Sequence, residues 1–504
     1  MVATKETVDN FIQNASQTIE DFYTKICDDN YRLEHYGEKS SNLLRCAVEL
    51  RRDIRFVLID LLTSLRACLK SEHYFEKIYH IKNLEGIRIE GYNLLCGFKK
   101  TKQYTVWTRL GIALQAKIAN ESNIELQSYN DLELLYERIS GRFDLVLATN
   151  QERTSRNLTF HYDDDLLKVY EQLVAVKNRG EDDPIKRVVP WMDLLLWVQF
   201  LCDSIELVES KHGYKLPDVS TYRPSRLRPV LLRFYKQMAK DLEKQDKLHC
   251  ALNMAFEHVD DIDWSALQKK KLLKIQEFLS GYSQKDDQTN VFSDFVDIFN
   301  INILIYLLFA DIASVMNAYM NAGCDVEYPL TFRRLSISKY AALSHLVGYD
   351  DKEKQVALWP LVQATIPNDA SLFRLEADHI REGFDSLVQE KDIQTRALYV
   401  HLIDRYSHES NVPAIMEKMD GVDWINEFKE LVRLVQVLGS AKKFLEKWMR
   451  ELATRVDKMT KESQAKRLEQ IKAFRELINN AKCTDEVRKS FDESMDKIEE
   501  LICF

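Results

Sequence analysis

The chain contains few of the residues that interrupt helices. Only 14 of its 504 residues are glycine and 9 are proline. This scarcity argues against a turn-rich β architecture and favours long helices with few breaks. Apolar residues recur three and four positions apart, as on one face of a helix, in residues 9–27, 43–69, 132–148, 166–176 and 192–209. We therefore predict an all-α fold.

Cysteine pairs and long uninterrupted apolar runs are also missing. The nine cysteines include no Cys-x-x-Cys pair and no Cys/His zinc spacing, which is typical of reduced thiols in the cytoplasm and predicts no metal site. No apolar run follows Lys5, so we expect no signal peptide. The most apolar stretch, 298–316, contains Asn300, Asn302 and Asp311, which favours a buried helix over a membrane span. We expect a cytoplasmic protein without membrane contact.

An excess of positive charge is absent as well. The formal net charge is −9, whereas proteins that coat nucleic acid are usually basic, so any contact with RNA or DNA must be local or made with the help of a partner. The sequence has no Gly-x4-Gly-Lys-Ser/Thr loop, no Gly-x-Gly-x-x-Gly and no His-Glu-x-x-His. Nucleotide hydrolysis, dinucleotide chemistry and zinc proteolysis therefore have no visible site, and we expect no cofactor.

Two halves of the chain share an ordered set of features. Tyr92 precedes Trp107 by 15 residues, and Tyr340 precedes Trp359 by 19. A glycine follows each tyrosine, a Phe-Asp pair follows each tryptophan, and an arginine follows each Phe-Asp pair; these residues are Gly97, Phe143-Asp144 and Arg156 in one half, and Gly348, Phe384-Asp385 and Arg396 in the other. This order predicts a diverged duplication. The alternative is that amphipathic helices of similar length resemble one another by chance.

The duplication predicts three parts. Residues 1–230 and 231–440 would form two repeated helical-bundle lobes. Residues 441–504 belong to a C-terminal extension that is rich in Lys, Glu, Arg and Leu. The stretch 427–501 predicts two or three long amphipathic helices, with a break near 479–484.

Each half also contains an Arg-x4-His element at the equivalent position. The first is formed by Arg156 and His161, with Asn157 after the arginine, and the second by Arg396 and His401. The spacing alone is unspecific, since Arg374 and His379 form a third pair outside the repeat register, which we interpret as background. Equivalent placement in both halves is what distinguishes the first two pairs.

The segment Arg156-Asn157-x3-His161-Tyr162 resembles the Arg-Asn-x3-His-x-Tyr signature of HEPN domains, with the tyrosine one position early. The resemblance covers a short segment of the first half and reaches the second only through the repeat, where Ala397 and Leu402 depart from the pattern. It implies helical bundles whose paired Arg/His motifs form one composite, metal-independent ribonuclease site. A chain with two copies would build this pair within one polypeptide.

These residue types suit RNA cleavage. Histidine exchanges a proton near neutral pH, and arginine stabilises the charge that grows on a phosphate. Asn157 would donate a hydrogen bond to a phosphate oxygen or orient the histidine. Positions five apart on a helix are separated by about 140°, so Arg156 and His161 converge only at a helix break or with help from the other half.

Two functions therefore follow from the sequence. One is a HEPN-type endoribonuclease in defence or stress response, with RNA as substrate and a protein partner or inhibitor that restrains it. The other is a catalytically inactive helical scaffold or regulatory subunit that binds protein. A cleft shared by the two Arg-x4-His elements would favour the enzyme, and wide separation would favour the scaffold. The sequence does not indicate an oligomeric state.

Overall fold

The prediction of an all-α fold is confirmed. The structure, a computed structural model, describes residues 5–37, 41–97, 105–120, 126–146, 184–220, 229–243, 287–349, 351–388, 395, 398–402, 409–419, 424–480, 489, 492–493 and 496. Every regular element in these ranges is a helix, and none of the described residues belongs to a β-strand.

The helices of the N-terminal half are α1 (Lys5–Glu34), α2 (Asn42–Lys70), α3 (Tyr74–Cys96), α4 (Val106–Asn120), α5 (Leu126–Val146), α8 (Pro184–Lys211) and α9 (Pro229–Glu243). Those that follow are α12 (Asp287–Met320), α13 (Glu327–Leu346), α14 (Asp351–Gln355), α15 (Leu358–Ala364), α16 (Ser371–Asp385), α18 (Val412–Met419) and α19 (Trp424–Asn480). Four of the predicted helical ranges correspond to α1, α2, α5 and α8. The fifth, 166–176, lies outside the described residues.

The chain forms two compact units, each assembled from separate stretches of sequence. Unit 1 comprises Met1–Trp264, Leu304–Leu358 and Glu382–Leu438, and unit 2 comprises Ser265–Ile303, Trp359–Arg381 and Gly439–Phe504. The lobes expected at 1–230 and 231–440, and the extension at 441–504, stay a prediction.

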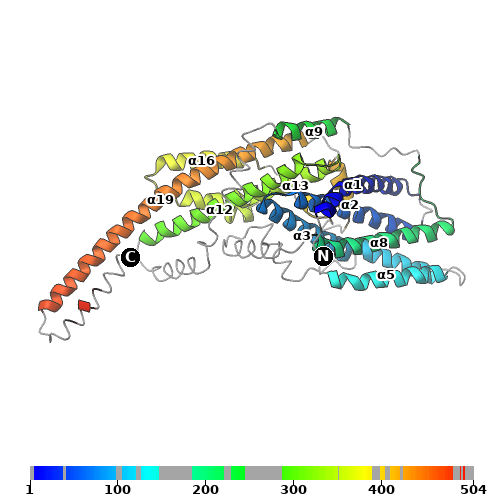
Figure 1. Cartoon of the computed structure of the whole chain (residues 1–504), viewed down its shortest axis with the longest axis horizontal. Helices are drawn as coiled ribbons and strands as arrows, with labels where there is room; N and C mark the ends of the chain where they lie inside the picture. Colours follow the sequence, from blue (N-terminus) through cyan, green and yellow to red (C-terminus); the bar gives the residue numbers. More distant parts are fainter. Residues whose placement is uncertain are drawn as a thin grey trace. The chain divides into compact units, whose positions relative to one another are not determined.

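Helix α2 is the centre of unit 1. It packs against α1, α3, α4 and α8, and Figure 1 shows α1, α2, α8 and α5 lying alongside one another. Gly91 on α3 permits a close approach between helices, because a Cβ atom there would lie 3.0 Å from Cγ1 of Val57 and 3.1 Å from Cζ2 of Trp191. Since neighbours surround α2, its charged residues between Arg51 and Arg66 are buried and must find partners inside the protein.

Unit 2 has an aromatic core of its own. Phe373 on α16 packs against Trp448 on α19, with ring centroids 4.9 Å apart. The two buried indoles also donate hydrogen bonds, from Trp448 to the hydroxyl of Thr365 and from Trp359 to the carbonyl of Ala377, each at 3.0 Å. The polar atom of each ring is thereby satisfied inside the core.

The expectation of a buried helix at the most apolar stretch is confirmed. Ile298 and Met316, the ends of the most apolar stretch, are buried in α12 at 0% and 1% exposure. Helix α19 forms the first part of the helical stretch expected at 427–501, and the break expected near 479–484 stays a prediction, since residues 481–484 lie outside the described residues.

Two glycines of the predicted repeat each lie at the end of a helix. Gly97 follows α3 and Gly348 lies just beyond α13, with φ angles of 72° and 73°. Glycine adopts this left-handed conformation without steric cost, so both positions suit the end of a helix. Trp107 and Trp359, which follow, are both buried. The duplication itself stays a prediction.

One described helix meets the length and composition of a membrane span. It covers Val188–Lys211 of α8, and 44% of its most apolar window is buried inside the protein. A single helix of this kind is weak evidence for a membrane span, because core helices pass the same test.

Candidate functional site

Of the residues predicted to form the site, the structure describes His401. Arg156, Asn157, His161 and Arg396 lie outside the described residues. Whether the two Arg-x4-His elements meet therefore stays a prediction. The contacts of His401 with the described residues come from unit 1.

His401 faces a carboxylate from a distant part of the sequence. It directly follows the helical residues 398–400, and its Nδ1 lies 3.3 Å from Oε2 of Glu90 on α3. The side chain of His401 is 16% exposed and that of Glu90 is 7% exposed. A carboxylate at Nδ1 favours a proton on that nitrogen and fixes the orientation of the ring. The imidazole is thus oriented at a position that solvent still reaches.

The backbone on both sides of His401 is also fixed. Before it, the carbonyl of Tyr399 accepts a hydrogen bond of 3.0 Å from Nε of Arg333 on α13. At the residue itself and beyond it, Asn411 donates from its side chain to the carbonyl of His401 at 2.8 Å and from its backbone to that of Leu402 at 2.9 Å. Such anchoring keeps a reactive side chain in one geometry.

Arg333 belongs to the Asp60 cluster, which consists of Asp60, Arg333 and Arg334. The carboxylate of Asp60 on α2 accepts from Arg333 at 3.0 Å and from Arg334 at 2.6 Å. Burial opposes the ionisation of Asp60, but the guanidinium groups of Arg334 and Arg333 outweigh it and hold its pKa below the ordinary value. The cluster contains two cations and one anion, and all three residues are less than 5% exposed.

His80 lies close to Arg334, one of the two cations of the Asp60 cluster. It is 1% exposed, and neither ring nitrogen has a hydrogen-bond partner among the described residues. Burial lowers its pKa to about 3, and the charge of Arg334 adds to the effect. His80 is therefore a neutral core residue at physiological pH, in contrast to the partly exposed His401.

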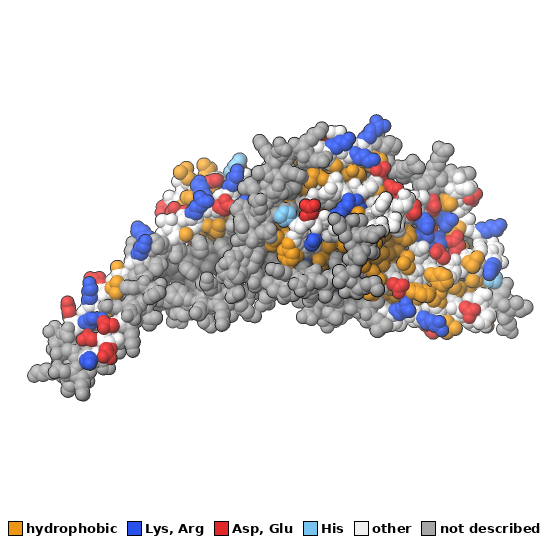
Figure 2. Space-filling view, viewed as in Figure 1, with side chains coloured by type: hydrophobic (Ala, Val, Ile, Leu, Met, Phe, Trp, Pro, Cys, Tyr) orange, Lys and Arg blue, Asp and Glu red, His pale blue; other side chains and the backbone are white. Residues whose placement is uncertain are grey.

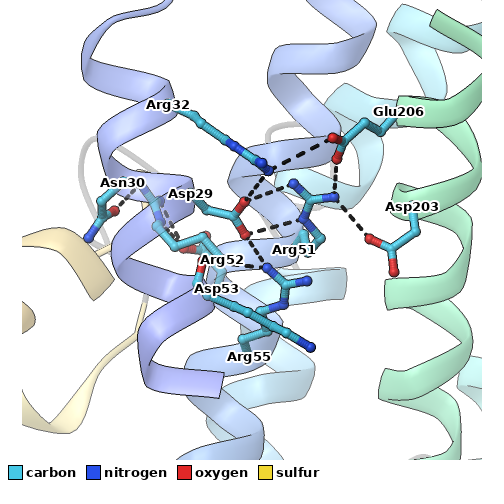
Figure 3. Close-up of polar contacts among 10 residues, drawn as sticks. Asp29, Asn30, Arg32, Arg51, Arg52, Asp53, Arg55, Asp203 and Glu206 are labelled. Atoms are coloured by element: carbon cyan, nitrogen blue, oxygen red, sulfur yellow. Dashed lines mark hydrogen bonds and ion pairs between the residues drawn. The ribbon is translucent and has the colours of Figure 1, made fainter. Parts of the chain in front are cut away.

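A second network, the Asp29 cluster, joins α1, α2 and α8 (Figure 3). Asp29 accepts from Arg51 at 2.8 Å and from Arg55 at 2.6 Å. Arg51 also pairs with Asp203 at 2.9 Å and with Glu206, both on α8. Arg32 completes the cluster, which holds three cations and three anions. Buried charges must be paired, and the equal numbers of cations and anions allow three helices to pack around this cluster. We therefore interpret the Asp29 cluster as structural.

No family model matches the chain, no curated protein is detectably similar to it in sequence, and no solved structure matches its fold. The chemistry of its own residues is therefore the basis for inferring function. Within the part of the chain that the structure describes, no group of three or more His, Cys, Asp or Glu side chains is arranged to hold a metal ion.

Sequence reasoning missed Glu90, Asp60 and Arg333. A signal for Asp60 was present, because it is a lone carboxylate in an otherwise apolar helical stretch, Phe-Val-Leu-Ile-Asp-Leu-Leu at 56–62. A buried charge needs a partner, so such residues mark polar contacts between helices. The sequence could not identify His401 as the partner of Glu90, because 311 residues separate the two.

Proposed function

We propose that the protein is a metal-independent endoribonuclease of HEPN type, acting in defence or stress response, with His401 as a general acid or base. The supporting observation is the pairing of His401 with Glu90. A histidine whose Nδ1 faces a carboxylate is oriented to exchange protons through Nε2, as in other sites where a carboxylate positions a catalytic imidazole. Its exposure of 16% leaves the ring accessible from solvent.

The reaction is a transphosphorylation within the RNA strand. A histidine removes the proton of a 2′-hydroxyl, whose oxygen attacks the adjacent phosphorus. The bond from phosphorus to the 5′-oxygen breaks, and that oxygen leaves with a proton from the second histidine of the pair His161 and His401. Arg156 and Arg396 would stabilise the phosphate, and Asn157 would donate a hydrogen bond to it. The products are a 2′,3′-cyclic phosphate and a 5′-hydroxyl.

The test is cleavage of a mixed RNA pool in the presence of a chelator, scored by the appearance of cyclic-phosphate ends. We expect His401→Ala and His161→Ala each to reduce cleavage at least about 100-fold, the usual range for loss of a general acid or base. Glu90→Gln keeps the shape of the side chain that faces His401 but removes its charge, so we expect a smaller loss of RNA cleavage, roughly 10-fold. The pH profile of Glu90→Gln should also shift relative to wild type.

The chain contains a matched control. His379 on α16 is exposed and belongs to the background pair, in which Arg374 donates to the carbonyl of Ile366 at 3.0 Å. His379→Ala should cleave RNA like wild type. Equal losses in His379→Ala and His401→Ala would contradict a specific role for His401.

The second candidate function is a catalytically inactive scaffold that binds protein. The observation in its favour is the outer face of α16, where Leu372 is 78% exposed and Leu375 is 69% exposed. Exposed leucines one turn apart are typical of a face that contacts another protein. If neither wild type nor any variant generates cyclic-phosphate ends, while Leu372→Ser abolishes a function of the protein in cells, the scaffold replaces the enzyme.

A further inference from the structure

The guanidinium group of Arg334 has more donors than the surrounding protein has acceptors. Its Nη2 donates to the carbonyl of Asp60 at 2.7 Å and to the carboxylate of Asp60 at 2.6 Å. Its Nε and Nη1 are buried and have no hydrogen-bond partner among the described residues. Arg333, the preceding residue on α13, uses each of its side-chain nitrogens on Asp60 or on the carbonyl of Tyr399. The unmet donors of the Asp60 cluster therefore belong to Arg334.

His80 on α3 is a second buried side chain with unmet polar atoms. It is 1% exposed, and neither ring nitrogen has a partner within the described part of the chain. The neighbouring Tyr79 also reaches α13, where its hydroxyl lies 3.2 Å from that of Ser338. Ser338 lies one turn after Arg334 on the same side of the helix. This part of α3 therefore packs against the side of α13 from which Arg334 projects, and the charge of Arg334 contributes to the lowered pKa of His80.

The other buried cations of α3 and α13, and the one that follows Asp60 on α2, each have a carboxylate of their own. The pairs are Arg66 with Glu327, Lys339 with Glu430, and Lys82 with Asp311. The remaining buried carboxylates of α3, Glu76 and Glu90, face Asn317 and His401. Among the described residues of these helices, the Asp60 cluster therefore keeps one unmatched positive charge.

Burial makes this unmatched charge costly. A guanidinium does not release its proton at physiological pH, so it cannot become neutral as a buried lysine can. Figure 2 shows the contrasting case toward the C-terminal end of α19, where Lys and Arg lie among Asp and Glu at the surface and salt can screen them. The three residues of the Asp60 cluster are less than 5% exposed. A bound anion would both accept the unmet hydrogen bonds and balance the charge.

We propose that a small monovalent anion of the size of chloride binds in the core of unit 1, at the unmet donors of Arg334 and a ring N–H of His80. One negative charge balances the cluster. A singly charged ion also loses less hydration energy on burial than sulfate or phosphate. The neutral imidazole supplies one N–H donor. This anion site is independent of the proposed ribonuclease activity, and a failure of RNA cleavage leaves it unaffected.

The first experiment follows thermal unfolding of the full chain by circular dichroism at neutral pH, while sodium chloride replaces sodium gluconate at constant ionic strength. Gluconate is too large for a sealed site. We therefore expect the midpoint to rise with chloride and then saturate, with a gain of about 1–2 °C when chloride exceeds its Kd roughly tenfold. Bromide should act like chloride. Identical midpoints in gluconate and chloride overturn the anion site.

Arg334→Met removes the unmatched cation and leaves Asp60 paired with Arg333 alone, so the response to chloride should disappear. The matched control is Arg433→Met, which removes an exposed arginine of unit 1 and should keep the wild-type response. A response that persists in Arg334→Met is a general effect of salt and overturns the anion site.

His80→Leu provides a second test, which serves if Arg334→Met does not fold. It keeps the unmatched charge but removes the N–H ligand. The chloride concentration that gives half of the midpoint rise should therefore increase roughly 10-fold, because one hydrogen bond to a charged group is lost. The exposed His379→Leu should keep the wild-type concentration. Equal concentrations for His80→Leu and wild type overturn the placement of the anion beside His80.

Discussion

The two charge clusters on α2 are made of the same residue types but differ in charge balance. In the Asp29 cluster, three arginines meet three carboxylates, and Asp203 and Glu206 reach solvent with side chains 46% and 31% exposed. In the Asp60 cluster, two arginines share one carboxylate, and all three residues are buried. Removing one charged residue should cost little unfolding free energy in a cluster that is balanced and partly exposed to water. The cost should be larger in a cluster that is buried and has more cations than anions.

The difference also bears on the site. The ion pairs of the Asp29 cluster tie α1 and α8 to α2 and, among the described residues, include none of the segment 398–402. The Asp60 cluster holds Arg333, which in turn holds the carbonyl of Tyr399, two residues before His401. Changes in the Asp60 cluster are thus expected to affect both stability and the geometry of the site, and changes in the Asp29 cluster to affect stability alone.

The largest effect is expected for Asp60→Asn. It leaves Arg333 and Arg334 without the one carboxylate that lies within ion-pair distance of them among the described residues. Breaking a buried pair in this way costs about 3–5 kcal/mol of unfolding free energy. Urea denaturation followed by circular dichroism would measure the loss. An unchanged midpoint would mean that the cluster contributes nothing to stability.

Asp29→Asn is expected to cost less, about 2 kcal/mol, although Asp29 is completely buried. Two of its three arginine partners keep a carboxylate, Arg51 through Asp203 and Glu206 and Arg32 through Glu206. Arg55 alone loses the one carboxylate within ion-pair distance of it among the described residues, whereas Asp60→Asn leaves both arginines of its cluster without one. The same urea experiment compares the two variants directly. A loss as large as that of Asp60→Asn would show that charge balance is not the property that separates the clusters.

The sequence predicted the helices better than the contacts among them. Periodicity identified α1, α2, α5 and α8 because each has a face that must be buried, and this signal is local. The partner of Glu90 depends on how α3 meets a segment 311 residues away, which no local pattern encodes. His401 was selected through the repeat rather than through its surroundings. No local pattern marked Arg51 and Arg55 of α2 as buried, because their partners come from α1 and α8.

The buried His80, near Arg334 of the Asp60 cluster, makes the stability of the fold depend on pH. The unfolded chain protonates this histidine below about pH 6.5, whereas the folded chain does so only near pH 3. The unfolded state therefore binds more protons in this window, and stability falls as the pH falls, by about 1.4 kcal/mol per unit. Between pH 6.5 and pH 5 this single residue should account for about 2 kcal/mol.

The measurement compares wild type with His80→Leu, since other buried groups contribute to the absolute slope. Burial raises the pKa values of Glu76 and Glu427, which opposes the effect of His80. We expect the variant to lose less stability than wild type between pH 6.5 and pH 5. The exposed His379→Gln should retain the wild-type slope, and identical slopes in all three proteins would contradict a neutral, buried His80.

The smallest effect is expected for Asp203→Asn, at the solvent end of the Asp29 cluster. The side chain of Asp203 is 46% exposed, and Arg51 keeps Asp29 and Glu206 as partners. Solvent screens such a pair, so the loss should stay below about 1 kcal/mol and shrink further in high salt. The urea midpoints of Asp203→Asn and Asp29→Asn, each measured at low and at high salt, distinguish the contribution of the exposed end of the cluster from that of the buried end. Only the buried end should keep its effect when salt is added, because ions cannot approach Asp29.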